Sequence, residues 1–125
     1  MFLENIFRLI LFVCGIVNFI PGLLVFFPSK LYSSYGISKS EANLELLLRH
    51  RAVMLGLIGI CMIFSSITLE YILLSTTIGL VSMISFIILY FPNKDNINKQ
   101  LTKVMKIDLI ASLFLFIAFL FYILT

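Results

Sequence analysis

Charged residues are scarce in this sequence of 125 residues, at 12% of the chain, whereas 62% of the residues are hydrophobic. A water-soluble domain is typically about one quarter charged and about half apolar. The shortage of charge therefore excludes a single water-soluble core and indicates an integral membrane protein. The net charge of +3 does not indicate nucleic-acid binding, because the basic residues form no continuous patch.

The sequence also has few residues that could bind a metal and none of the common catalytic motifs. The one histidine, His50, cannot hold a metal or a haem group by itself, and the two cysteines form no CxxC motif. Cys14 and Cys61 both lie in apolar runs, where we expect buried free thiols. The chain also lacks GxSxG, a glycine-rich phosphate loop and HExxH. We expect no metal and no cofactor, and we favour a protein that is not an enzyme.

Four apolar runs in the sequence are long enough to cross a membrane. A helix rises about 1.5 Å per residue, so roughly 20 apolar residues span the hydrocarbon core. The sequence therefore predicts an all-α fold, an integral membrane antiparallel four-helix bundle, as one transmembrane domain over residues 1–125. The predicted spans cover about residues 9–27, 52–69, 71–91 and 108–124.

Polar segments separate these spans and indicate where the helices begin. Residues 29–40 predict a short interfacial helix that Gly36 ends. We expect the second helix to begin near Ser40 and Glu41, the fourth to begin near Asn98, and a very tight turn to join the second and third. Glycine and serine recur on one face of the second and third helices, and such small residues let another backbone approach closely.

Basic residues are distributed unequally between the two sides of the predicted bundle. Eight of the nine flank one side, and only Arg8 lies on the other. By the positive-inside rule the basic side is cytoplasmic. We therefore predict a multi-pass protein of the inner membrane, with the first and third loops in the cytoplasm and both termini outside. The eight residues are Lys30, Lys39, Arg49, Arg51, Lys94, Lys99, Lys103 and Lys106.

Polar side chains gather where the second and fourth spans begin. Glu45 and Arg49 are four residues apart, in the order that favours an ion pair, and His50 follows them. Asp108 lies at matching depth on the fourth helix, and we expect it to pair with Arg49. Asn18 lies about 13 Å further into the membrane by helix rise, at the floor of any cavity. These five residues are the candidate polar cluster.

Two interpretations of the polar cluster are open. Charged residues that face a bundle interior indicate a functional site by default. The alternative is a structural cluster that fixes the register and orientation of the helices. Arg51 stands apart from both interpretations, because it lies about 200° around the helix from Arg49. We expect Arg51 to extend toward lipid phosphates.

Several short motifs resemble a known group of proteins. These motifs are Asn18-x-x-Pro21-Gly22, Tyr35-Gly36, and LLRHRAV from Leu47 to Val53 followed by Gly56-x-x-Gly59. They resemble small bacterial four-helix membrane proteins of unknown function, and the layout is similar to the broader DoxX-like proteins. The resemblance implies fold and location and adds no activity. Similar sequences sometimes carry the label phosphopantetheine adenylyltransferase, an activity of a soluble nucleotide-binding fold whose phosphate loop this chain lacks.

Three functions follow from these observations. The leading hypothesis is a protein that binds a small amphiphile or a lipid headgroup through the cytoplasmic-side polar cluster, or that serves as an accessory subunit. The first alternative is a small transporter or channel, which needs a homodimer because four helices rarely enclose a pathway. The glycine and serine faces of the second and third helices could supply the interface of that dimer. The second alternative is a lipid-modifying membrane enzyme with His50 as acid or base beside Asp108 or Glu45. Membrane lipids and a second copy of the chain are the expected partners.

Overall fold

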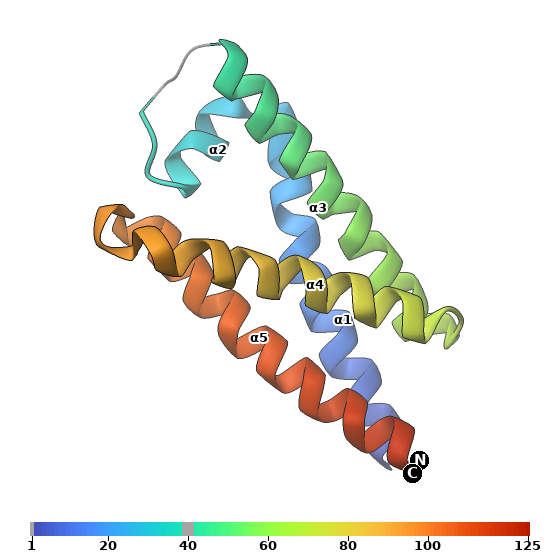
Figure 1. Ribbon diagram of the computed structural model, residues 1–125. Coiled ribbons are helices and arrows are strands. Elements are labelled where there is room, and N and C mark those ends of the chain that lie inside the picture. The colour runs from blue at the N-terminus through green and yellow to red at the C-terminus, as the bar shows by residue number, and fades with distance from the viewer. Residues whose placement is uncertain (1, 39–41) are drawn as a thin grey trace.

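The computed structural model describes residues 2–38 and 42–125, so the predictions on Lys39, Ser40 and Glu41 lie outside the described residues. The described part of the chain contains helices and no strand, which confirms the all-α prediction. The elements in chain order are α1 (Phe2–Leu23) with the 3₁₀ turn η1 (Leu24–Phe26), α2 (Pro28–Ser34), α3 (Ala42–Thr68), α4 (Ile72–Tyr90) with the 3₁₀ turn η2 (Phe91–Asn96), and α5 (Lys99–Leu124) (Figure 1).

Four helical segments are long and apolar enough to cross a membrane. Large apolar side chains also cover their outward faces, as lipid contact requires. The protein is therefore a multi-pass membrane protein. Three of the spans start earlier than the apolar runs, because a helix continues past the hydrocarbon into charged residues such as Arg8, Arg51 and Lys106. The four segments are Phe2–Phe26, Ala42–Thr68, Ile72–Asn96 and Lys99–Leu124.

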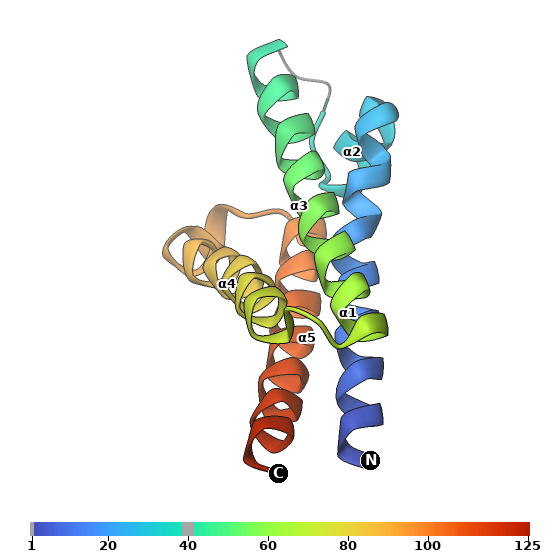
Figure 2. The same cartoon turned by 90° about the vertical axis from the view of Figure 1, so that its right-hand side faces the viewer.

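The four long helices do not all share one direction. Helices α1, α3 and α5 run along the length of the bundle, and α1 is antiparallel to the other two. Helix α4 crosses them obliquely, so that Figure 2 views it nearly along its axis. A tight turn joins α3 to α4, as predicted, and it places Leu69 and Tyr71 at φ values of 61° and 56°. Both chain termini lie at the same end of the bundle (Figure 1).

Small residues bring the backbones of α1 and α3 into direct contact. A methyl group on Gly22 would lie 2.7 Å from the Cα atom of Gly56, and one on Gly59 would lie 2.5 Å from the carbonyl oxygen of Gly15. Neither side has room for a side chain. The predicted packing role of these glycines is therefore satisfied inside one chain.

The small face of α4 is also used within the chain. The hydroxyls of Ser65 and Ser75 lie 2.6 Å apart, and Gly79 packs against the side chain of Met62. Ser75 and Gly79 were expected to supply part of a dimer interface. The structure places them between α3 and α4 instead, so a second copy of the chain would need another surface.

Two groups of buried side chains hold the helices together. The first lies between the four spans and includes Phe7, Leu11 and Leu115. The second lies under α2, where Leu31 and Tyr35 pack against Ala52 of α3. The interfacial helix predicted after the first span is thus docked on the bundle. Both cysteines are free, but only Cys14 is buried, and the expectation that Cys61 is buried is wrong because its face of α3 points outward.

Candidate functional site

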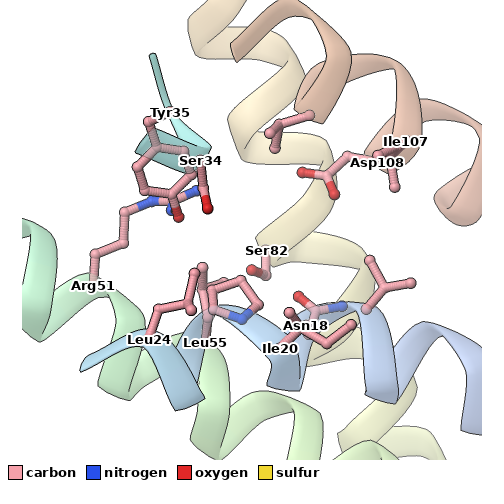
Figure 3. A pocket seen from close by; sticks show the side chains of 13 residues that line it. Asn18, Ile20, Leu24, Ser34, Tyr35, Arg51, Leu55, Ser82, Ile107 and Asp108 are labelled. Atoms are coloured by element: carbon pink, nitrogen blue, oxygen red, sulfur yellow. The ribbon is translucent and has the colours of Figure 1, made fainter. Parts of the chain in front are cut away.

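A cavity of about 290 Å³ lies where α1, the end of α2, α3, α4 and α5 converge (Figure 3). We call it the Arg51 cavity. Most of its wall is apolar, with a few polar side chains that converge on the same space. This combination is typical of sites that bind small molecules, and the volume is near the lower end of their range. The polar lining residues are Asn18, Ser34, Tyr35, Arg51, Ser82 and Asp108.

Arg51 is held in this cavity by two aromatic rings. Its guanidinium carbon lies 5.2 Å from the ring centre of Tyr35 and 5.3 Å from that of Phe86, within the range of cation–π attraction. Its Nη1 atom donates a hydrogen bond to the hydroxyl of Tyr35. The prediction that Arg51 extends to lipid phosphates on the surface is wrong. The segment that follows α2 brings Tyr35 against α3, and the rings and the hydroxyl draw the guanidinium inward.

Asp108 lies on the opposite wall from Arg51. Its carboxylate points from α5 into the cavity, as Figure 3 shows. The positive charge of Arg51 attracts this carboxylate across the space. Within residues 2–38 and 42–125, however, Asp108 forms no hydrogen bond and no ion pair. Two opposite charges therefore face one another across a cavity without touching.

Asn18 lines the cavity from α1. The side chain is 5% exposed. Its Nδ2 atom donates to the carbonyl oxygen of Cys14 at 2.9 Å and lies 3.9 Å from the sulfur of Met62. Both amide protons are thus directed at groups of the protein. The Oδ1 atom receives no hydrogen bond from the described residues, and it supplies an acceptor to the cavity.

Three residues of the predicted polar cluster lie outside the cavity. Arg49 is exposed, and its Nε atom donates to the carbonyl oxygen of Val25 at 3.0 Å. The expected pairing of Arg49 with Asp108 is therefore absent, and so is the Glu45–Arg49 ion pair, among the residues that the structure describes. His50 is exposed and Glu45 half-buried, and neither lines the Arg51 cavity. Of the five predicted residues, the cavity brings together Asn18 and Asp108.

The segment that carries Tyr35 is fixed by Asn98. The Nδ2 atom of Asn98 donates to the carbonyl oxygens of Tyr35 at 2.8 Å and of Gly36 at 3.2 Å. Its Oδ1 atom accepts from the backbone N–H of Leu101 at 2.8 Å and so caps α5. Gly36 has a φ of 65°, and a side chain there would collide with Gln100. One asparagine thus joins the start of α5 to the residue that orients Arg51.

The polar groups of the cavity are hydrogen-bond donors and acceptors, two of which carry opposite charges. Arg51 offers N–H donors and a positive charge, and Asp108 and Asn18 offer acceptors. No histidine stands beside a lining serine to activate it, since His50 lies elsewhere on α3. Over the described ranges, no three His, Cys, Asp or Glu side chains gather where they could hold a metal ion.

Sequence reasoning missed Arg51 and Tyr35, the pair that shapes the cavity. The sequence places Arg51 on a helix face but does not say which neighbour covers that face. The one signal was the Tyr35-Gly36 pair, which predicts an aromatic side chain at a sharp change of chain direction.

In comparisons with known proteins, the chain matches no protein-family model, no curated protein sequence and no solved structure. The resemblance to small bacterial four-helix membrane proteins of DoxX-like layout therefore stays a prediction.

Proposed function

We propose that this membrane protein binds a small amphiphile or a lipid headgroup in the Arg51 cavity. The observation that carries the proposal is the separation of Arg51 from Asp108. A charge removed from water is stable only when it is paired and hydrogen-bonded. Here the two charges face one another across a mostly apolar space. A polar group of a ligand between them would complete the bonding of both.

The depth of the cavity supports an amphiphile as ligand. Arg51 and Asp108 lie where the apolar runs of α3 and α5 begin, and Asn18 lies ten residues beyond Arg8 on α1. At about 1.5 Å per residue, Asn18 is about 15 Å from the charged start of α1, near the middle of a hydrocarbon core about 30 Å thick. The polar lining of the cavity thus extends from the level where lipid headgroups meet the acyl chains into the hydrocarbon. In the orientation that the basic residues predict, this is the cytoplasmic leaflet of the inner membrane.

The other two hypotheses gain no support from the geometry. The transporter or channel needs a second copy of the chain, and the glycine and serine faces proposed for that contact are used within one chain. The enzyme needs His50 beside Asp108 or Glu45, and His50 is exposed on α3, outside the cavity that Asp108 lines. A role as accessory subunit is compatible with ligand binding and stays part of the proposal.

Thermal unfolding with and without added amphiphile tests this function. The protein in a mild detergent is titrated with single-chain amphiphiles of known headgroup, such as lysophosphatidylethanolamine, lysophosphatidylglycerol and a fatty acid. A ligand that binds only the folded state raises Tm as its concentration increases. We expect at least one amphiphile to raise the Tm of the wild type and to leave that of Arg51→Gln unchanged.

Arg49→Gln is the matched control for this titration. Arg49 lies two residues away on the same helix, is exposed, and does not line the cavity. We expect this variant to respond as the wild type does. Equal Tm increases in the wild type and both variants would contradict the proposal, because binding would then not require the cavity.

A further inference from the structure

A wholly apolar groove between α1 and α5 adjoins the Arg51 cavity. Val17 and Ile107 line both the cavity and the groove. From these two residues the groove continues to Leu9 on α1 and to Phe114 on α5. Because α1 and α5 are antiparallel, both of these directions lead toward the end of the bundle that holds the chain termini (Figure 1).

The groove runs away from the polar cavity, in the direction in which an acyl chain would extend from a headgroup bound there. Leu9 lies eight residues from Val17, and Phe114 lies seven residues from Ile107. By helix rise the groove extends about 10–12 Å from the cavity toward the side of the membrane that holds the chain termini. A polar cavity that begins at headgroup depth thus opens into an apolar path that leads through the hydrocarbon.

The charges in the cavity select among headgroups. An anionic headgroup would be attracted by Arg51 but repelled by the carboxylate of Asp108. A cationic headgroup would be attracted by Asp108 but repelled by Arg51. In a headgroup that carries both a phosphate and an ammonium group, the phosphate can pair with Arg51 and the ammonium with Asp108. A primary ammonium has three N–H donors, and Asp108 and the Oδ1 atom of Asn18 provide acceptors for them. A trimethylammonium group, as in phosphocholine, has no such donors.

We infer, on the basis of the proposed function, that the ligand is a zwitterionic phospholipid with a phosphoethanolamine headgroup. Its phosphate binds Arg51, its ammonium group binds Asp108, and one acyl chain lies in the groove between α1 and α5.

Electron paramagnetic resonance with chain-labelled lipids measures this selectivity directly. The protein is reconstituted in bilayers that contain spin-labelled phosphatidylethanolamine, phosphatidylglycerol or phosphatidylcholine, and the protein-bound fraction of each label is compared. We expect the wild type to bind phosphatidylethanolamine roughly tenfold more strongly than the other two, as one charge-assisted hydrogen bond to Asp108 predicts. In Asp108→Asn the preference over phosphatidylglycerol should be lost. A wild type that prefers phosphatidylglycerol or that does not discriminate would overturn the inference.

Two variants of α1 test the position of the acyl chain. Val13 lines the groove and is 49% exposed, so Val13→Phe fills the groove from its outer side. Ile16 is also exposed on α1 but lies outside the groove, which makes Ile16→Phe the control. We expect Val13→Phe to abolish the preference for phosphatidylethanolamine and Ile16→Phe to keep it. Equal preference in both variants, or displacement of the lipid by free phosphoethanolamine, would overturn the assignment of the groove.

These results are distinguishable from failure of the proposed function. If added amphiphiles stabilise the wild type but not Arg51→Gln, and the labelled lipids show no preference, the cavity binds an amphiphile of another headgroup class. If amphiphiles stabilise both equally, the cavity is not the binding site and the inference fails with the proposed function.

Discussion

The hydroxyl of Tyr35 accepts a hydrogen bond from Nη1 of Arg51, and the guanidinium lies over the face of the same ring. This contact decides which of the two neighbouring arginines of α3 enters the cavity. Tyr35 itself is buried against α3, and Asn98 holds its backbone carbonyl from the start of α5. The orientation of Arg51 thus depends on three segments that are far apart in the sequence.

Removal of the Tyr35 hydroxyl should weaken ligand binding more than it weakens the fold. Tyr35→Phe keeps the ring and its packing but leaves Nη1 of Arg51 without its acceptor. A hydrogen bond to a charged group contributes about 1.5–3 kcal/mol, so we expect a roughly tenfold weaker response to added amphiphile. The measurement is the concentration of amphiphile that produces half of the Tm increase.

Tyr71→Phe is the control for this substitution, because the Tyr71 side chain is exposed at the opposite end of α3. It should respond to amphiphile as the wild type does. If Tyr35→Phe also binds with unchanged affinity, the hydroxyl does not position Arg51.

The positions of the helices could be predicted from the sequence because they depend on local features. Apolar runs indicate the spans, Asn98 caps α5, and Gly36 ends the polar segment with a positive φ. Counting residues along helices of constant rise puts Asn18 about 13 Å deeper than Asp108. Both nevertheless line one cavity, because the contact between α1 and α5 sets their relative position.

Which of the two arginines, Arg49 or Arg51, enters the cavity could not be predicted in the same way. Residue spacing places Arg49 and Arg51 on nearly opposite faces of α3 but does not say which face is covered. The answer depends on where α2 docks and on the oblique course of α4, which brings Phe86 to Arg51. These are tertiary contacts, which the periodicity of the sequence does not predict.

The contact between α1 and α3 should be the part of the bundle least tolerant of added volume. In Gly59→Ala the new methyl group would lie 2.5–2.8 Å from backbone atoms of Gly15 and Phe19, which cannot move independently. Overpacking of this kind typically costs about 1–3 kcal/mol. We expect a clear decrease in Tm in detergent.

Gly79→Ala is the matched comparison, because its methyl group meets the flexible end of the Met62 side chain at 2.7 Å. Methionine adapts to such changes through its rotatable bonds. We expect a smaller decrease in Tm than for Gly59→Ala. The reverse order would show that α1 and α3 are packed less closely than the structure indicates.

The orientation predicted from the basic residues can be tested by cysteine labelling in intact cells. Phe2 and Ser33 are both exposed, at the start of α1 and in α2. With both termini outside, Phe2→Cys should react with a membrane-impermeant maleimide in intact cells, and Ser33→Cys should react only after lysis. The native chain serves as background, since both of its cysteines lie within spans. The opposite labelling pattern would reverse the proposed orientation.

Native mass spectrometry of the protein released from its own membranes tests the central claim most directly, because it detects the ligand that the cell supplies. The wild type is compared with Arg51→Gln and Arg49→Gln after release from a mild detergent. We predict a bound species of defined mass on the wild type and on Arg49→Gln, and its loss from Arg51→Gln. A bound species that persists in Arg51→Gln, or a bare protein in all three, would contradict binding in the Arg51 cavity.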